Sequence, residues 1–182
     1  KLSEWVKHKT KDYDASHDVV HAANVVRLSK EIITHNIPKS KKYIKDAIVA
    51  LSWTHDVCDK KYNANKSEAV EAVVKVCNEL EMDPRAVEIV KNVIGHISFS
   101  KRLSQGEPSD LDPEEMIVYY AVSDADMLEA MGISGIVRTF MYQAVIRQPS
   151  TSALTHVEER LFKCKENLFY DWAKNEGSVR HD

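Results

Sequence analysis

The chain has 182 residues, a length typical of one domain, and 43% of them are hydrophobic, which is enough for a substantial core. Its 25 Lys and Arg residues are nearly balanced by 28 Asp and Glu residues, giving a net charge of -3. This balance excludes a general electrostatic attraction to nucleic acid or anionic lipid, so a partner has to be inferred from a site. We expect one domain spanning residues 1–182, with no nucleic-acid or membrane partner.

The three cysteines, Cys58, Cys77 and Cys164, are odd in number, lie far apart and fall within helical apolar patterns. This use of cysteine is typical of a reducing compartment rather than of a disulfide framework. No segment approaches the roughly 20 apolar residues that cross a bilayer, and residues 1–4 resemble neither a signal peptide nor a lipidation site. These features predict a cytoplasmic protein.

Glycine and proline are scarce and no segment alternates polar and apolar residues for long, so the sequence predicts an all-α protein, a compact helical bundle. Residues 98–112, rich in Ser, Gly and Pro, are expected to form the one long loop, and such loops are often functional. In the first half of the chain, the expected helices run from a cap at Asp14 or Ser16 to about Pro38, from Ser40 through the wholly apolar stretch 47–51, and from Asn65 to Leu80. In the second half, they run from the Asp83-Pro84 cap to about Ile97, from the Asp112-Pro113 cap to Glu129, from Val137 to Arg147, and from Ala153 to Lys174.

Buried charge indicates the candidate site, because an Asp or His in apolar surroundings is costly unless it is paired or binds a metal. His21 lies within an apolar helical pattern, His55 and Asp56 follow the most hydrophobic run of the chain, and Asp124 and Asp126 follow another apolar run. Taken singly, His21 is explained equally well as a satisfied core histidine, and Asp124 or Asp126 is better explained by a capping or salt-bridge role. Together, two imidazoles and two carboxylates without sulfur suit Mn, Fe, Co, Ni or Zn.

The order of these residues resembles that of the HD-domain metal-dependent phosphohydrolases: a His in the first long helix, His-Asp ending the second, and Asp-x-Asp-x-Leu ending a later one. The resemblance covers nearly the whole chain. It implies an HD-type bundle that binds one divalent transition metal, in preference to Mg, through His21, His55, Asp56 and Asp126. The phrases similar to a small single-domain bacterial subgroup are Ser16-His17-Asp18-Val19-Val20-His21, Gly95-His96-Ile97-Ser98-Phe99-Ser100, Ser123-Asp124-Ala125-Asp126-Met127-Leu128 and Gly135-Ile136-Val137-Arg138-Thr139-Phe140.

Some members of that subgroup are nucleoside triphosphate pyrophosphohydrolases. The resemblance therefore implies hydrolysis of a small nucleotide, with a manganese-type ion and with a (deoxy)nucleoside triphosphate cleaved to monophosphate and pyrophosphate, and it allows a homodimer. The alternatives are a nucleoside monophosphate phosphatase and a non-catalytic, ligand-sensing HD domain. Two departures from the family pattern remove positive charge that would face phosphate: Asn24 stands where an Arg is common, and Met127 replaces the usual basic residue.

Several further residues are candidates for catalysis or substrate binding. Asp59, three residues after Asp56, is expected to be either the general base or a helix-end charge. Lys60, Lys101 and Arg138 are candidates for phosphate contact, against the alternative of solvated surface charge. Arg138 is the strongest of them, because its apolar neighbours would make an unpaired guanidinium costly.

The roles of the remaining polar residues depend on their distance from the ion. His17, four residues before His21, is expected to support a metal ligand rather than bind the ion. His96 is expected either to contact substrate or to interact with a helix C-terminus. Asp124 and Asp126 lie about 200° apart around a helix, so only one of them can bind the ion. The resemblance selects Asp126 and leaves Asp124 to orient a ligand imidazole.

Overall fold

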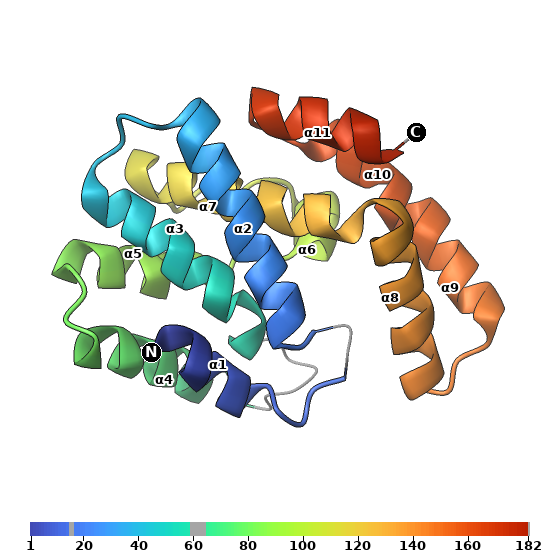
Figure 1. Ribbon diagram of the computed structural model, residues 1–182, viewed down its shortest axis with the longest axis horizontal. Helices are drawn as coiled ribbons and strands as arrows, with labels where there is room; N and C mark the ends of the chain where they lie inside the picture. The colour runs from blue at the N-terminus through green and yellow to red at the C-terminus, as the bar shows by residue number, and fades with distance from the viewer. Residues whose placement is uncertain (15–16, 59–64, 182) are drawn as a thin grey trace.

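The computed structural model describes residues 1–14, 17–58 and 65–181, which contain helices and no strand, so the all-α prediction is confirmed (Figure 1). The elements in chain order are α1 (Leu2–Lys9), α2 (Val19–Asn36), α3 (Lys42–Thr54), the 3-10 turn η1 (His55–Cys58), α4 (Lys66–Glu79), α5 (Pro84–Val93), α6 (Phe99–Gln105), α7 (Pro113–Ala130), α8 (Gly132–Val145), α9 (Ser150–His156), the π turn η2 (Val157–Leu161), α10 (Phe162–Cys164), the 3-10 turn η3 (Lys165–Asn167) and α11 (Asp171–His181).

Side-chain caps mark the starts of α2 and α7, which have 18 residues each. The Asp18 carboxylate accepts hydrogen bonds from two backbone N–H groups in the first turn of α2, at 2.9 and 3.1 Å. Asp18 is therefore the cap of α2. The sequence predicted Asp14 or Ser16 as this cap. The prediction for Asp14 is wrong, and Ser16 lies outside the described residues. At the start of α7, Asp112 and Glu115 form a reciprocal capping box, as the sequence predicts.

Two expectations about the chain after residue 97 are corrected. The expected loop 98–112 contains the short helix α6, which Ser98 caps and which ends at Gly106 with a φ of 79°. The expected helix 153–174 is interrupted near residues 168–170, where the backbone N–H groups of Phe169 and Tyr170 bond to the carboxylate of Asp124 instead of to a preceding turn. Long-range contacts thus override the local helical pattern here.

The core lies where α2, α3 and α7 pack against one another, with α5 against α3 and α7 and with α4 outside α5. The apolar stretch 47–51 lies inside this core, as expected: Ala47, Ile48 and Leu51 have no exposed surface. α1 covers α2 and α3, and α11 covers α2 and α7 (Figure 1). This arrangement brings the first turn of α2, the end of α3 and the second half of α7 to one place.

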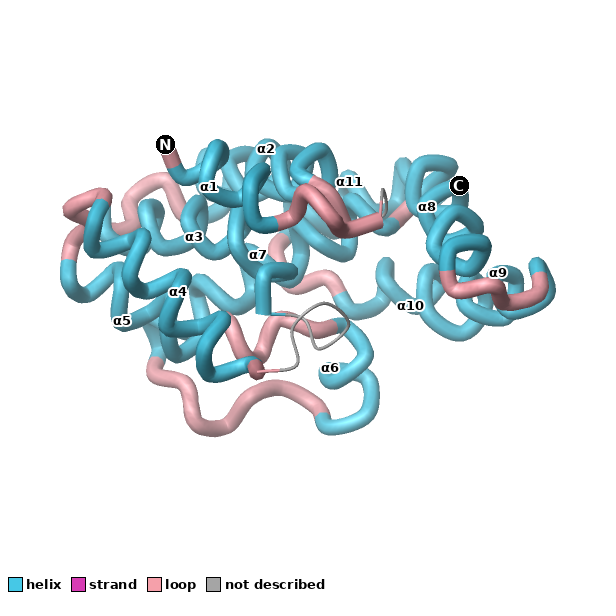
Figure 2. The backbone as a smooth tube through the Cα atoms, turned by 90° about the horizontal axis from the view of Figure 1, so that it is seen from below, coloured by secondary structure: helices cyan, strands magenta, loops and turns pink. Residues whose placement is uncertain are grey.

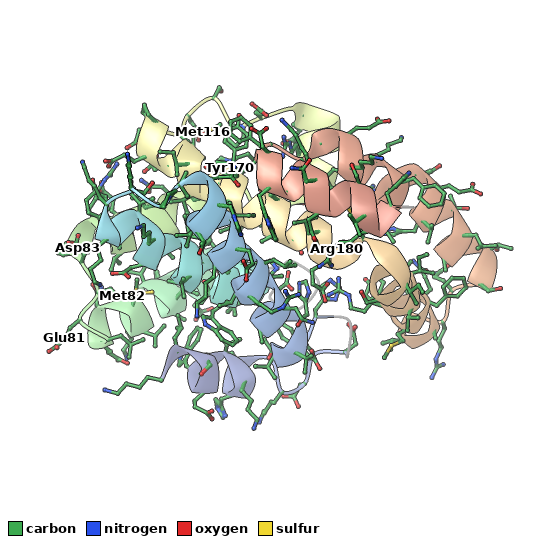
Figure 3. All side chains as sticks on the ribbon, turned by 45° about the horizontal axis from the view of Figure 1, so that its top comes forward. Glu81, Met82, Asp83, Met116, Tyr170 and Arg180 are labelled. Carbon is green, nitrogen blue, oxygen red and sulfur yellow. The ribbon has the colours of Figure 1, made fainter. Side chains whose placement is uncertain are left out.

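The segment from α8 to α10, which we call the arm (residues 132–164), extends from one end of the bundle (Figure 2). At its base, Arg180 of α11 lies beside the junction of α7 and α8 and donates a hydrogen bond to the carbonyl of Leu128 at 3.0 Å (Figure 3). The three cysteines are buried free thiols. Within the described residues, no helix combines the length and the apolar character that crossing a membrane requires.

Candidate metal centre

Three elements present the predicted metal donors at the centre of the bundle. His21 lies in the first turn of α2, which Asp18 caps. His55 and Asp56 open the 3-10 turn η1, which continues α3 after Thr54. Asp126 lies in the second half of α7. The four side chains are therefore held by helices that pack against one another rather than by loops.

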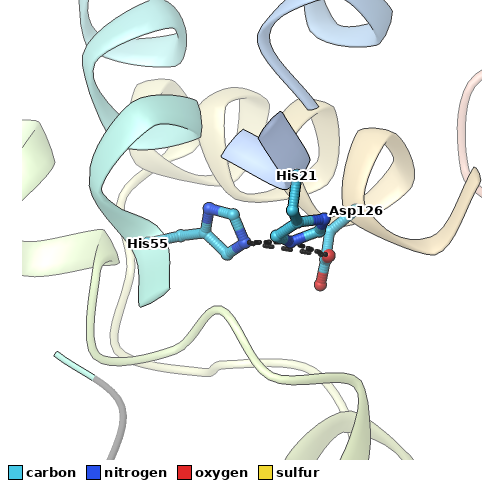
Figure 4. Close-up of side chains that lie close together, drawn as sticks. All are labelled: His21, His55 and Asp126. Carbon is cyan, nitrogen blue, oxygen red and sulfur yellow. Dashed lines mark hydrogen bonds and ion pairs between the residues drawn. The ribbon is translucent and has the colours of Figure 1, made fainter. Parts of the chain in front are cut away.

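The donor atoms of His21, His55 and Asp126 all lie within 4.8 Å of one another (Figure 4). The Nε2 atoms of His21 and His55 lie 3.2 Å apart. Asp56 Oδ2 lies 3.3 and 3.4 Å from these two nitrogens, and Asp126 Oδ1 lies 3.5 and 3.7 Å from them. Adjacent donors around an ion with bonds of about 2.1 Å lie roughly 3.0–3.5 Å apart, so this spacing fits a single divalent ion.

The contacts at the Nδ1 atoms of the two imidazoles determine whether their Nε2 atoms can donate electron pairs to an ion. The Nδ1 atom of His55 lies 3.1 Å from the carbonyl of Ser52, which can only accept, so this nitrogen carries the proton. The Nδ1 atom of His21 lies 3.0 Å from the carboxylate of Glu129, which favours the same tautomer, and it also contacts a terminal nitrogen of Arg138, a donor that is itself paired with Glu129. With a proton on each Nδ1 atom, the two Nε2 atoms would offer their lone pairs to a cation bound between them.

The carboxylates of the site also require a cation. Asp56 Oδ2 is buried and accepts no hydrogen bond from the described residues. Burial alone would raise the pKa of Asp56, but the charges of His55 and His21 hold it well below its usual range. Burial would likewise lower the pKa of His21, but the Asp56 and Glu129 carboxylates raise it to about 10. A divalent ion that replaces this proton would satisfy all four donors.

Glu129 is a residue of the site that the sequence analysis did not single out. One of its oxygens contacts His21 Nδ1 and also forms an ion pair with Arg138, while the other accepts a hydrogen bond from Asn24 at 3.4 Å. Burial would raise the pKa of Glu129, but His21 and Arg138 lower it, so the carboxylate is ionised. Its signal in the sequence is an acidic residue among the apolar residues 127–131, the same signal that identified Asp126.

Asp124 lies on the opposite side of α7 from the ion site. It has no exposed surface, and its carboxylate accepts backbone hydrogen bonds from Phe169 at 2.9 and 3.0 Å and from Tyr170 at 2.8 Å. Burial raises the pKa of Asp124 to about 6, although these backbone donors lower it. The expectation that Asp124 orients a ligand imidazole is corrected: Glu129 contacts the imidazole, and Asp124 holds the chain that leads into α11.

Two histidines lie differently from what was expected. His17 precedes the cap of α2, so it is outside the helix, and its ring centroid lies 6.2 Å from that of His21 and 5.7 Å from that of Tyr142. Its support of a metal ligand stays a prediction. His96 follows α5, which ends at Val93, and its Nε2 lies 3.5 Å from a carboxylate oxygen of Asp110. The substrate contact of His96 stays a prediction beside this contact with an acidic residue.

Two cavities open beside the four donors. The larger, about 340 Å³, is lined by all four of them and by the basic side chains of Arg138, Arg160, His17 and His156. Among the described residues that line it, the only carboxylates are the two predicted metal ligands. The smaller, about 190 Å³, shares His55 and Asp56 with the larger. Basic side chains around acidic metal donors suit an anionic ligand that bridges ion and protein.

The smaller cavity contains Lys101, one of the predicted phosphate contacts. Its ammonium group donates a hydrogen bond to the carbonyl of Gly95 at 2.9 Å, and that of Lys66 donates to the same carbonyl at 3.2 Å. Lys101 is thus placed beside the site, and its contact with substrate stays a prediction. Asp59 and Lys60, the predicted general base and a further phosphate contact, lie outside the described residues.

Comparison with known proteins identifies the fold. No protein-family model matches the sequence. The uncharacterized protein YpgQ of Bacillus subtilis is 24% identical over 186 residues, which cover 100% of this chain and 85% of YpgQ. Its crystal structure in complex with ADP matches 99% of this chain and 88% of its own with a TM-score of 0.75 and 22% identity.

Two further solved structures share this architecture. A protein of Lactobacillus plantarum matches 98% of this chain and 87% of its own, with a TM-score of 0.78 and 22% identity. An HD-superfamily hydrolase of Bacillus thuringiensis matches 99% of this chain and 87% of its own, with a TM-score of 0.72 and 24% identity. The chain therefore shares the fold of these proteins, one of them an HD-superfamily hydrolase, and the HD-type helical bundle expected from the sequence is confirmed.

Proposed function

We propose that this protein is a divalent-metal-dependent phosphohydrolase of small nucleotides, and that it cleaves a nucleoside triphosphate to the monophosphate and pyrophosphate. The observation that carries the proposal is the convergence of four donor atoms, from His21, His55, Asp56 and Asp126, at the wall of a cavity with basic side chains. The cavity volume of about 340 Å³ falls within the usual range of small-molecule sites. The ADP complex of the similar YpgQ supports a nucleotide as ligand.

The side chains of the site divide the work of hydrolysis among them. A bound divalent ion supplies an activated water and withdraws charge from a phosphoryl oxygen. His55 and His21 offer lone pairs to the ion because Ser52 and Glu129 occupy their other nitrogens. Arg138, at the cavity wall, is placed to bind a phosphate oxygen. Removal of a proton from the water is assigned to Asp59, as the sequence predicts.

Arg138 is suited to phosphate binding because its guanidinium is only partly used within the protein. One terminal nitrogen is paired with Glu129, whereas the Nε atom is buried and makes no hydrogen bond with the described residues. The Arg138 side chain is 20% exposed and lines the larger cavity, so a phosphate oxygen bound there would pair with its charge, and charge-assisted hydrogen bonds of this kind are among the stronger ones in proteins.

The function is tested by incubating nucleoside mono-, di- and triphosphates with the protein and Mn, Co, Ni or Mg, and by measuring orthophosphate and pyrophosphate separately. We expect pyrophosphate from a triphosphate with a transition metal. Orthophosphate released from a monophosphate would indicate the phosphatase instead, and nucleotide binding without turnover with any ion would indicate a ligand-sensing domain. The Asp126→Asn protein, purified in the same way, controls for contaminating hydrolases.

Replacing Arg138 by Ala is expected to raise the Michaelis constant or lower the turnover number by about tenfold or more, because a charge-assisted phosphate contact is lost. Steady-state kinetics with the best substrate of the panel measures the effect. Arg27→Ala is the matched control, since Arg27 is exposed on α2 and is not among the residues lining either cavity. Unchanged kinetics in a folded Arg138→Ala protein would limit Arg138 to a structural role.

A further inference from the structure

The smaller cavity beside the ion site contains a lysine that the sequence analysis did not single out. Lys66 is the first residue of α4, the helix that packs against η1. Its side chain lines this cavity together with Lys101 and with the predicted metal ligands His55 and Asp56. Cations are favoured at the C-terminus of a helix rather than at its N-terminus, so the stability of α4 does not explain a lysine in its first turn.

The ammonium groups of Lys66 and Lys101 are held close together. Both donate hydrogen bonds to the carbonyl oxygen of Gly95, at 3.2 and 2.9 Å. Two positive charges beside one neutral acceptor repel each other, and an anion that binds to both would offset that repulsion. Among the described residues that line the smaller cavity, Asp56 is the only acidic one, and its carboxylate belongs to the ion site. The smaller cavity therefore offers two positive charges to an anion.

Gly95 leaves open the space that the ammonium group of Lys66 occupies. A Cβ atom added at Gly95 would lie 2.9 Å from Lys66 Nζ, closer than such atoms normally approach. The backbone does not require a glycine here, since the described glycines with positive φ are Gly106 and Gly132. The absence of a side chain at residue 95 is therefore explained by the position of Lys66.

The two cavities meet at the ion site, because His55 and Asp56 line both of them. A ligand with a chain of phosphates can thus contact the ion site and extend into both cavities. The larger cavity has the apolar side chains of Phe99, Met127 and Leu161 beside its basic groups, which suits the nucleoside end of a nucleotide. The smaller cavity, with its two lysines, suits the end of the phosphate chain.

We propose that the smaller cavity is the subsite for the pyrophosphate end of the substrate, which the ammonium groups of Lys66 and Lys101 bind. This inference rests on the proposed function, in which water attacks the α phosphorus at the ion site. The water oxygen forms the new bond to that phosphorus, and the water proton passes to the solvent through the general base. The bond from the α phosphorus to the bridging oxygen breaks, and pyrophosphate leaves with the electron pair of this bond. Lys66 and Lys101 stabilise the negative charge that develops on it.

Binding of inorganic pyrophosphate tests the subsite without any turnover. Calorimetry at a fixed concentration of free Mn gives the dissociation constants of pyrophosphate and of adenosine monophosphate in separate titrations. We expect Lys66→Met to weaken pyrophosphate binding by about tenfold or more and to leave monophosphate binding unchanged, because a charge-assisted contact is lost in the smaller cavity alone. Lys75→Met is the matched control, since Lys75 is on the same helix and its side chain is 78% exposed.

Gly95→Ala provides a second variant, which keeps both lysines. The added methyl group should displace Lys66 Nζ, so this protein should lose pyrophosphate affinity as the Lys66→Met protein does. Because both changes remove the same contact, the double variant Gly95→Ala/Lys66→Met should lose no more affinity than Lys66→Met alone. Circular dichroism and the melting temperature show whether each variant is folded.

Three results would each overturn the subsite: unchanged pyrophosphate affinity in a folded Lys66→Met protein, an equal loss of affinity for adenosine monophosphate, and additive losses in the double variant. The proposed function is tested separately, because these titrations require no hydrolysis. A protein that binds pyrophosphate through Lys66 but cleaves no triphosphate would support the subsite and contradict the proposed function.

Discussion

Replacing Asp126 by Asn should abolish both metal retention and hydrolysis. Asp126 Oδ1 lies 3.5 and 3.7 Å from the two imidazole nitrogens, and the substitution removes a negative charge from the ion site without changing the size of the side chain. We expect elemental analysis to find about one Mn, Ni or Zn ion per chain in the reconstituted unmodified protein and none in the variant. Retention of a full equivalent of metal by a folded Asp126→Asn protein would contradict the site.

The same substitution at Asp124 is the matched control, because Asp124 lies two residues away on the same helix. Its carboxylate accepts three backbone hydrogen bonds, and an amide has only one oxygen to accept them. We expect Asp124→Asn to keep its metal and to lower the free energy of unfolding by about 1–3 kcal/mol, the cost of an unsatisfied buried donor. If Asp124→Asn lost the metal and Asp126→Asn kept it, the two carboxylates would have been assigned in the wrong order.

Replacing Glu129 by Gln should weaken metal binding by about 10–100-fold, because a carboxylate that orients a ligand imidazole also raises its basicity. The neutral amide can still accept a hydrogen bond from His21 Nδ1, at 3.0 Å in the structure, but it no longer neutralises Arg138. Titration of the metal-free protein with Mn or Zn in a calorimeter measures the dissociation constant directly and requires no substrate.

Glu115→Gln is the control for this substitution. Glu115 is on the same helix and is 4% exposed, against 5% for Glu129, but it accepts hydrogen bonds from Asn92 and from the backbone of Asp112 at the far end of α7. The Glu115→Gln protein should have a lower free energy of unfolding and an unchanged metal affinity. Equal affinities in the Glu129→Gln, Glu115→Gln and unmodified proteins would leave Glu129 without a role at the ion.

Much of the helical architecture could be predicted from the sequence because its signals are local. The Asp112-Pro113 signal starts α7 as expected, since a cap satisfies backbone groups within its own first turn. The apolar stretch 47–51 is buried because all its sides are hydrophobic, whatever the neighbouring helix. The order of His and Asp residues along the chain resembles the pattern of a known family, and this resemblance implied four candidate donors, which the structure brings together.

Other features depended on contacts between residues far apart in the sequence. Apolar periodicity did not distinguish Asp124 from Asp126, because both lie on helix faces that are buried against other elements. The tertiary structure distinguishes them: one carboxylate meets the backbone near residue 169, and the other meets two imidazoles. The partnership of Glu129 with His21 joins residues 108 positions apart. Local patterns determine which segments become helices, but the partner of a buried charge is set by whichever distant donor the packing brings within hydrogen-bond distance.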